Sequence, residues 1–238
     1  TQVSKDNQWA VSYLFLQHPD TGEILPSEPG LVVGRSEGEE WRVALPGNSD
    51  WATWVNSVPE DLLDASAKSY WLEINQIEAV DVPEEALTGY LLPWEGGKLV
   101  SLSGSVSHDL WVTSGSAHYA FDFYISGTMF PVLASKSGTV HLIRDTQIDN
   151  DDATPGNYIV LKDTETNTYQ LYLHLSYDSV PDDLKIGDYV HQGQFIGIAD
   201  DTGASTGHHL HFMVHKTSTS YWGTSVDIAF RDVAINGG

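Results

Sequence analysis

The second half of the chain is a series of short apolar runs separated by turns rich in Gly, Asp and Asn. Such a cadence is typical of strands that follow one another in an antiparallel sheet. A parallel α/β fold would need helical crossovers, for which the sequence shows no periodicity. We therefore predict a mainly β, antiparallel-sheet domain, with strands near residues 98–103, 117–124, 131–134, 139–143, 158–162, 169–174, 189–191, 195–199 and 210–215.

The first third has a different character, and its patterns predict a smaller mixed α/β region. Residues 9–17 alternate loosely like a strand, and residues 31–33 and 41–45 look like the two arms of a hairpin. Pro59 and the two acids after it resemble the first turn of a helix that starts with Ser57 as its cap and continues to about Tyr70.

A boundary between the two parts is expected in residues 79–85, AVDVPEE, which are acidic and contain a proline. We therefore divide the chain into an N-terminal accessory or pro-segment-like region, residues 1–87, and a second domain, residues 88–238. The N-terminal region carries no constellation of chemical groups, so its expected role is packing.

Composition narrows the classes of function. The chain has 238 residues and a formal net charge of −22 with only 11 Lys and Arg, which argues against binding to nucleic acid, whose phosphates most of the surface would repel. It has no cysteine, so a zinc site would have to use nitrogen and oxygen ligands. No apolar run reaches the roughly 18 residues that a membrane-spanning helix needs. The start at Thr1, without a basic and apolar leader, suggests a processed or trimmed chain.

Residues 203–214, GASTGHHLHFMV, are the most informative stretch for function. In an extended strand His209 and His211 point to one face, while Leu210 and Phe212 point to the other. Two imidazoles on one face can bind a metal ion, although an isolated HxH pair is more often a solvated or hydrogen-bonded pair.

Two further pairs occur earlier in the same half. His118 and Asp122 are four residues apart and would share a face of a strand, where they could offer a nitrogen and an oxygen to a cation. Tyr172 and His174 are two apart and are expected on a common face. Alone, the first pair could be a hydrogen-bonded surface pair, and His174 could simply end a core strand.

Taken together, these pieces resemble a known family. The order HxxxD, YxHL, GDxVxxGQxIG and TGxSTGxHLHF is similar to the lysostaphin-type zinc endopeptidases, also called the LytM or β-lytic group, which degrade bacterial cell walls and elastin. The similarity covers roughly residues 91–214, in which GTMFPVLASKSGTV at 127–140 matches the Gly- and Pro-spaced strand pair of the family. Residues before about 88 are not covered.

The resemblance implies a catalytic zinc ion, Zn²⁺, held by His118, Asp122 and His211, with one coordination position left for water or substrate. It further implies that His174 and His209 assist proton transfer, and that Tyr172 or the second imidazole steadies the oxyanion. The sequence leaves open which histidine is the base. His108, fourteen residues before Asp122, is an alternative first ligand, because some relatives have a longer loop there; the compact AHYAFDF pattern favours His118.

The expected activity is zinc-dependent hydrolysis of peptide bonds, mainly in Gly- or Ala-containing peptidoglycan cross-links, by a secreted or periplasmic bacterial protein that is monomeric. The alternative is a non-catalytic or latent relative that activates other wall hydrolases, with residues 1–87 lying across the groove as a cover. Residues 145–152, DTQIDNDD, are interpreted as a solvated acidic turn rather than a calcium loop. Four other histidines are expected to be structural or solvent-facing, namely His141, His191, His208 and His215.

Overall fold

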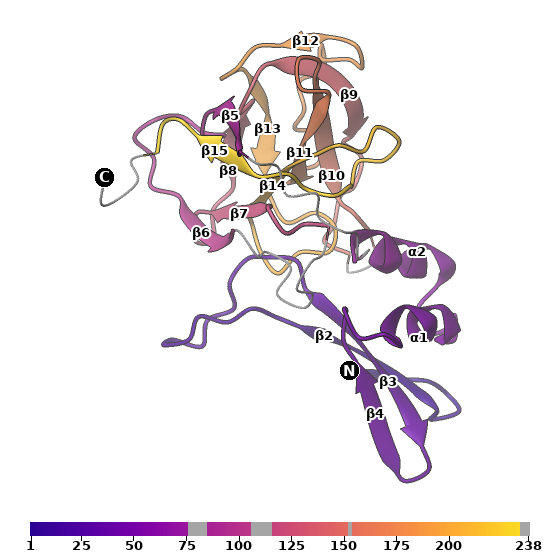
Figure 1. Cartoon of the computed structure of the whole chain (residues 1–238). Helices are drawn as coiled ribbons and strands as arrows, with labels where there is room; N and C mark the ends of the chain where they lie inside the picture. Colours follow the sequence, from indigo (N-terminus) through magenta and orange to yellow (C-terminus); the bar gives the residue numbers. More distant parts are fainter. Residues whose placement is uncertain (76–84, 106–115, 152–153, 234–238) are drawn as a thin grey trace.

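The structure is a computed structural model that describes residues 1–75, 85–105, 116–151 and 154–233. Within these residues strands far outnumber helices, and a small N-terminal part with two helices lies at one end of the molecule (Figure 1). The mainly β prediction is therefore confirmed. The expected boundary at residues 79–85 falls almost entirely outside the described residues.

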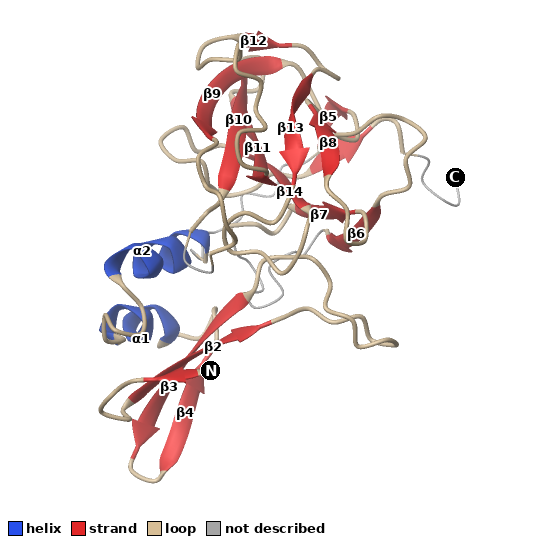
Figure 2. Cartoon of the chain, turned by 180° about the vertical axis from the view of Figure 1, so that it is seen from behind, coloured by secondary structure: helices blue, strands red, loops and turns tan. Residues whose placement is uncertain are grey.

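The N-terminal part is a four-stranded antiparallel meander followed by two short helices (Figures 1 and 2). The predicted hairpin is confirmed as β3 and β4, which pair along their length. The elements are β1 Gln2–Val3, β2 Trp9–Leu14, β3 Gly30–Glu37, β4 Glu40–Ala44, α1 Trp51–Ser57 and α2 Ala65–Ile74.

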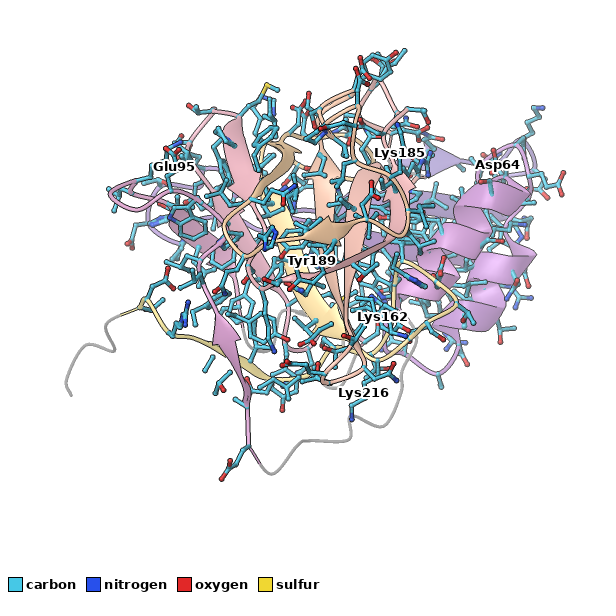
Figure 3. The ribbon with its side chains drawn as sticks, turned by 90° about the horizontal axis from the view of Figure 1, so that it is seen from above. Asp64, Glu95, Lys162, Lys185, Tyr189 and Lys216 are labelled. Carbon is cyan, nitrogen blue, oxygen red and sulfur yellow. The ribbon has the colours of Figure 1, made fainter. Side chains whose placement is uncertain are left out.

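The predicted helix from Ser57 to Tyr70 is wrong in its bounds. α1 ends at Ser57, because Val58 precedes Pro59 and takes an extended ψ of 134°, which proline imposes on the residue before it. α2 then begins after Asp64, whose carboxylate caps the helix by accepting the Ala67 N–H at 2.8 Å. Figure 3 shows Asp64 at the outer end of the helices, away from the large sheet.

The second part is built on a sheet of nine strands in the order β12-β9-β10-β11-β14-β7-β6, with β13 joining β11 to β8. All of its pairings are antiparallel. Two strands that the sequence did not predict, β5 and β15, form a separate parallel pair. The bounds are β5 Leu87–Tyr90, β6 Ser101–Gly104, β7 Phe121–Tyr124, β8 Phe130–Leu133, β9 Gly138–Arg144, β10 Asn157–Asp163, β11 Thr168–Leu175, β12 Tyr189–Val190, β13 Phe195–Ala199, β14 Leu210–His215 and β15 Ile228–Phe230.

Two apolar cores lie on opposite faces of β11 and β14. One face packs in a core with Phe130, Val132 and Ile196 from β8 and β13. The other contributes Leu171, Leu173 and Met213 to a core shared with Trp54 and Trp71 of the helices, so the N-terminal part packs on the face of the sheet that carries His211. No helix in the described parts of the chain has the length and apolar character to cross a membrane.

Candidate active site

The site is set by the register of three neighbouring strands. Asp122 of β7 pairs with His211 of β14, and His211 pairs with Leu173 of β11, so the three side chains point to the same face. Nδ1 of His211 lies 3.1 Å from Oδ1 of Asp122, and both side chains are fully buried. Residues 89 positions apart in sequence thus come together as the family resemblance implied.

The HxH prediction is confirmed in its geometry. Leu210 and Phe212 are buried in the core with β8 and β13, while His211 faces the N-terminal part. His209 lies just before β14, where its backbone bridges to Asp200. Its Nε2 lies 3.7 Å from Oδ1 of Asp122. The alternation therefore delivers both imidazoles to one cluster.

His174 reaches this cluster through a bulge. Its φ of 63° is in the left-handed region, and the pairing of β10 with β11 skips it: Asn157 pairs with Leu175, whereas Tyr158 pairs with Leu173. The extra residue turns the imidazole toward His209, and the ring centroids are 4.6 Å apart. Nδ1 of His174 donates to the Thr202 carbonyl oxygen at 2.7 Å, which leaves Nε2 facing the cluster.

The expectation that Tyr172 shares a face with His174 is wrong, because the bulge at His174 interrupts the alternation of side chains along β11. Tyr172 pairs with Phe212 and points into the opposite core. Its hydroxyl accepts the Ser135 N–H at 2.7 Å and donates to Gln170 Oε1 at 2.8 Å. Burial raises the pKa of this phenol far above its usual value. The structure therefore does not bring Tyr172 to the cluster.

A residue of the N-terminal part, Glu28, completes the cluster. Its Oε1 lies 2.8 Å from His211 Nδ1, 3.0 Å from His174 Nε2 and 3.6 Å from His209 Nε2. Glu28 stands between two prolines, Pro26 and Pro29, immediately before β3. No local pattern indicates this role, since a Ser-Glu-Pro segment in a turn-rich region is ordinarily solvated; the flanking prolines indicate only an extended path.

The charges in the cluster favour a cation. Burial lowers the pKa of His211, but Glu28 and Asp122 outweigh burial and raise it to about 10. His209 behaves likewise: burial lowers its pKa, while Asp122 and Glu28 raise it above the usual value. For His174, burial and the neighbouring His209 lower the pKa despite the contact with Glu28. Two carboxylates that hold positive charge on buried imidazoles create a site suited to a metal ion.

The donor set fits a zinc ion of the open catalytic type. Glu28, Asp122 and His211 offer ligand atoms that all lie within 4.8 Å of one another, and so do Glu28, His174 and His209. Nε2 of His209 is buried and makes no hydrogen bond among the described residues. Imidazole nitrogen and carboxylate oxygen are ligands that zinc accepts. Asp122 and His211 would hold the ion.

His118, the expected first ligand, is not brought into this cluster. It lies in the turn before β7, half-buried, with its ring 4.7 Å from that of Tyr119. The groups of metal-ligating atoms found in the described residues do not include it. The alternative, His108, lies outside the described residues. Of the three expected protein ligands, Asp122 and His211 lie together in this cluster.

Four other histidines of the described residues have partners of their own or face solvent. His141 contacts the Ser218 carbonyl oxygen, His191 is exposed, and His208 pairs with Asp200 at 2.8 Å. His215 is fully buried against Tyr169. Within the acidic loop, Asp145 accepts backbone N–H groups of residues 179 and 180, and no described member of that loop belongs to a metal-ligating group.

Buried histidines and carboxylates around one point of an antiparallel sheet are typical of metal-dependent hydrolases. Residues 116–222 match peptidase family M23. This part of the chain is a lysostaphin-type peptidase domain of that family.

Curated relatives support the same assignment. Lysostaphin of Staphylococcus simulans is 39% identical over 110 residues, which are 45% of this chain and 20% of that protein. Glycyl-glycine endopeptidase ALE-1 of Staphylococcus capitis is 38% identical over 108 residues, which are 45% of this chain and 27% of that protein. The chain thus spans only about a quarter or less of the length of these relatives.

Solved structures include the catalytic domain of lysostaphin from Staphylococcus simulans. It has 28% identity and a TM-score of 0.38, and the match covers 58% of this chain and 85% of that domain. The catalytic domain of the prophage-encoded M23 protein EnpA from Enterococcus faecalis, solved as a mutant, gives 20% identity and a TM-score of 0.42, with 58% and 94% covered.

Proposed function

We propose that the protein is a zinc-dependent endopeptidase that hydrolyses peptide bonds in bacterial peptidoglycan, in cross-links that contain Gly or Ala. The observation that carries this proposal is the convergence of His174 Nε2, His209 Nε2 and His211 Nδ1, with Asp122 Oδ1, around the point where Glu28 Oε1 lies. The name of ALE-1, a glycyl-glycine endopeptidase, supports glycine in the substrate. Action on a cell wall implies a secreted or periplasmic location.

The residues divide into a binding set and a proton-transfer set. Asp122 and His211 would hold the ion, and His118 and His108 are the two histidines that the sequence offers as a further ligand. When bound, zinc polarises the scissile carbonyl and brings the pKa of water to about 7. Proton transfer belongs to the imidazoles of His174 and His209.

Hydrogen bonds fix the orientation of these two imidazoles. Nδ1 of His174 donates to the carbonyl oxygen of Thr202, and Nδ1 of His209 donates to that of Gly207 at 2.9 Å. Each ring therefore presents Nε2 to the reacting atoms. One imidazole takes a proton from the attacking water as its oxygen bonds to the carbonyl carbon. The amine then leaves with a proton from an imidazole as the C–N bond breaks.

A non-catalytic adaptor is the less favoured alternative. Such relatives have lost ligands, whereas this chain keeps Asp122, His211 and both proton-transfer histidines in a buried cluster. A latent form is favoured by one specific observation: Glu28 lies where zinc and substrate would meet. We therefore infer that the N-terminal region inhibits the peptidase until this carboxylate is withdrawn.

The deciding experiment is mass spectrometry of the products released from purified peptidoglycans and glycine-rich peptides. The full chain would be assayed with zinc, with a chelator, and after limited proteolysis in residues 79–85. We expect new amino termini at Gly or Ala, loss of cleavage with chelator, and faster cleavage after proteolysis. Stoichiometric zinc without cleavage in any arm would support the adaptor instead.

A further inference from the structure

The segment that carries Glu28 bends at Pro26 and Ser27 and lies against loops and strands of the second part of the chain. We name residues 25–29, LPSEP, the strap. Ser103 of β6 donates its hydroxyl to the Pro26 carbonyl oxygen on one side of the strap. On the other side, Thr206 lies in the loop that leads to His209. The strap is therefore held by hydrogen bonds from two separate segments of the second part of the chain.

Thr206 holds the strap entirely through the strap's backbone. Its Oγ1 accepts the Ser27 N–H at 2.9 Å, and its N–H donates to the Ser27 carbonyl oxygen at 3.0 Å. The same hydroxyl donates to the Leu25 carbonyl oxygen at 2.8 Å. Thr206 thus hydrogen-bonds to both the N–H and the C=O of Ser27. The next residue, Glu28, contacts the histidines.

The loop also packs directly against the strap. Gly207 follows Thr206, and a Cβ atom at Gly207 would lie 3.6 Å from the ring of Pro26, which is an ordinary van der Waals contact. A hollow of about 340 Å³ continues beside the strap, lined on the peptidase side by Ser101, Tyr124 and Gly127 among others. The cleft is therefore longer than the part that the strap fills.

When the strap is withdrawn, Thr206 has a backbone N–H and a hydroxyl that need new partners. An N–H and a C=O from the same residue are what an extended peptide offers. A glycine-rich cross-link has no side chains to recognise, so backbone hydrogen bonds are the specific contacts that it can make.

We propose that Thr206 is a substrate-positioning residue, which clamps the N–H and C=O of the substrate residue next to the catalytic centre, and that the strap occupies this clamp in place of the substrate. This inference rests on the proposed peptidase function. It adds to that function the residue that positions the substrate and the way in which a side-chain-poor peptide is recognised.

The test uses the full chain with Ser27→Pro and Glu28→Ala, which remove the strap's N–H donor and its carboxylate. Chelator-treated protein is titrated calorimetrically with pentaglycine and with a synthetic peptide of residues 22–30. We expect both peptides to bind, Thr206→Val to weaken binding of each about 5- to 30-fold, and Thr206→Ser, which keeps the hydroxyl, to weaken it less than about 3-fold. With zinc and pentaglycine, Thr206→Val should raise KM by a similar factor while kcat changes less than about twofold.

Three outcomes would overturn the clamp: equal binding by the Val and Ser variants, a fall in kcat at unchanged KM, or failure of the 22–30 peptide to bind. If the 22–30 peptide binds in a Thr206-dependent manner but pentaglycine does not, the clamp stands and the proposed glycine substrate is wrong. The binding arm needs no catalysis, so it separates the two failures.

Discussion

Oε1 of Glu28 lies 2.8 Å from Nδ1 of His211, although the two residues are 183 positions apart and belong to different parts of the chain. The Glu28 side chain is only 12% exposed. A carboxylate takes up this position only if the cluster compensates its loss of hydration, and three imidazoles do so. Because of this contact, a change in the catalytic cluster is expected to change how stably the N-terminal part packs on the sheet, and the reverse.

Replacing Glu28 with Ala should therefore activate the enzyme. The change removes charge-assisted hydrogen bonds worth about 1.5–3 kcal/mol, so we expect kcat/KM to rise by about one to two orders of magnitude. Zinc affinity, measured by competition with a chromophoric chelator, should be unchanged or higher. Thermal stability should fall, because the buried imidazoles lose their partner.

The matched control is Glu39→Ala, which makes the same change of charge in the exposed turn between β3 and β4. It should leave activity and zinc affinity within about twofold of the wild type. A marked loss of zinc in Glu28→Ala alone would contradict inhibition and would make Glu28 a required ligand.

Two single substitutions, His118→Ala and His108→Ala, can identify the first zinc ligand. The sequence pattern favours His118, whereas the structure places this side chain outside the cluster. We expect that only one of His118→Ala and His108→Ala loses stoichiometric zinc by atomic absorption, because a site of Asp122, His211 and one further histidine needs all three. Loss of zinc in neither variant would show that Glu28 serves as the third protein ligand.

The sequence predicted those parts of the site that depend on regular strand geometry. His209 and His211 alternate with Leu210 and Phe212, and the period of a strand is enough to place both imidazoles on one face. Their meeting with Asp122 was predicted only through the family resemblance. Strand order and register depend on the whole sheet, so no local pattern contains that information.

The parts that the sequence did not predict depend on departures from regularity. Tyr172 and His174 would share a face in an ideal strand, but the bulge at His174 separates them. Glu28 joins the site because two parts of the chain pack together through a common apolar core. The helix bounds were missed because the effect of Pro59 on Val58 outweighed the helix-like composition of the turn.

A substitution at His209 should distinguish a role in catalysis from a role in metal binding. The ring faces the cluster through Nε2, while Asp122 and His211 are the proposed ligands. His209→Ala should therefore keep stoichiometric zinc and lose about two or more orders of magnitude in kcat. His211→Ala is the comparison and should lose both. Loss of zinc in His209→Ala would assign this residue to the metal instead.

The absence of a side chain at Gly156 leaves room for Thr202, whose carbonyl oxygen holds the His174 ring in place. Gly156 has a φ of +75°, and a Cβ atom there would clash with the Thr202 carbonyl oxygen, which accepts the hydrogen bond from Nδ1 of His174. Gly156→Ala should therefore lower the free energy of unfolding by several kcal/mol and reduce kcat, because Thr202 must move. Gly127→Ala is the control: its φ is +59° with nothing within 4 Å, so only backbone strain of about 1–2 kcal/mol is expected. Equal losses of stability would show that the contact with Thr202 is unimportant.

His215 should make the folded state sensitive to mild acid. Burial lowers its pKa to about 4 from the usual 6.5, and the nearby His141 contributes. Between these values the unfolded chain binds a proton that the folded chain excludes, so stability is lost as pH falls from about 6.5 toward 4. The full difference corresponds to about 3 kcal/mol. His215→Phe keeps a ring beside Tyr169 and should flatten the dependence of the free energy of unfolding between about pH 7 and 5 in urea titrations. A difference between variant and wild type that is the same at both ends of this range would show that His215 does not exclude the proton.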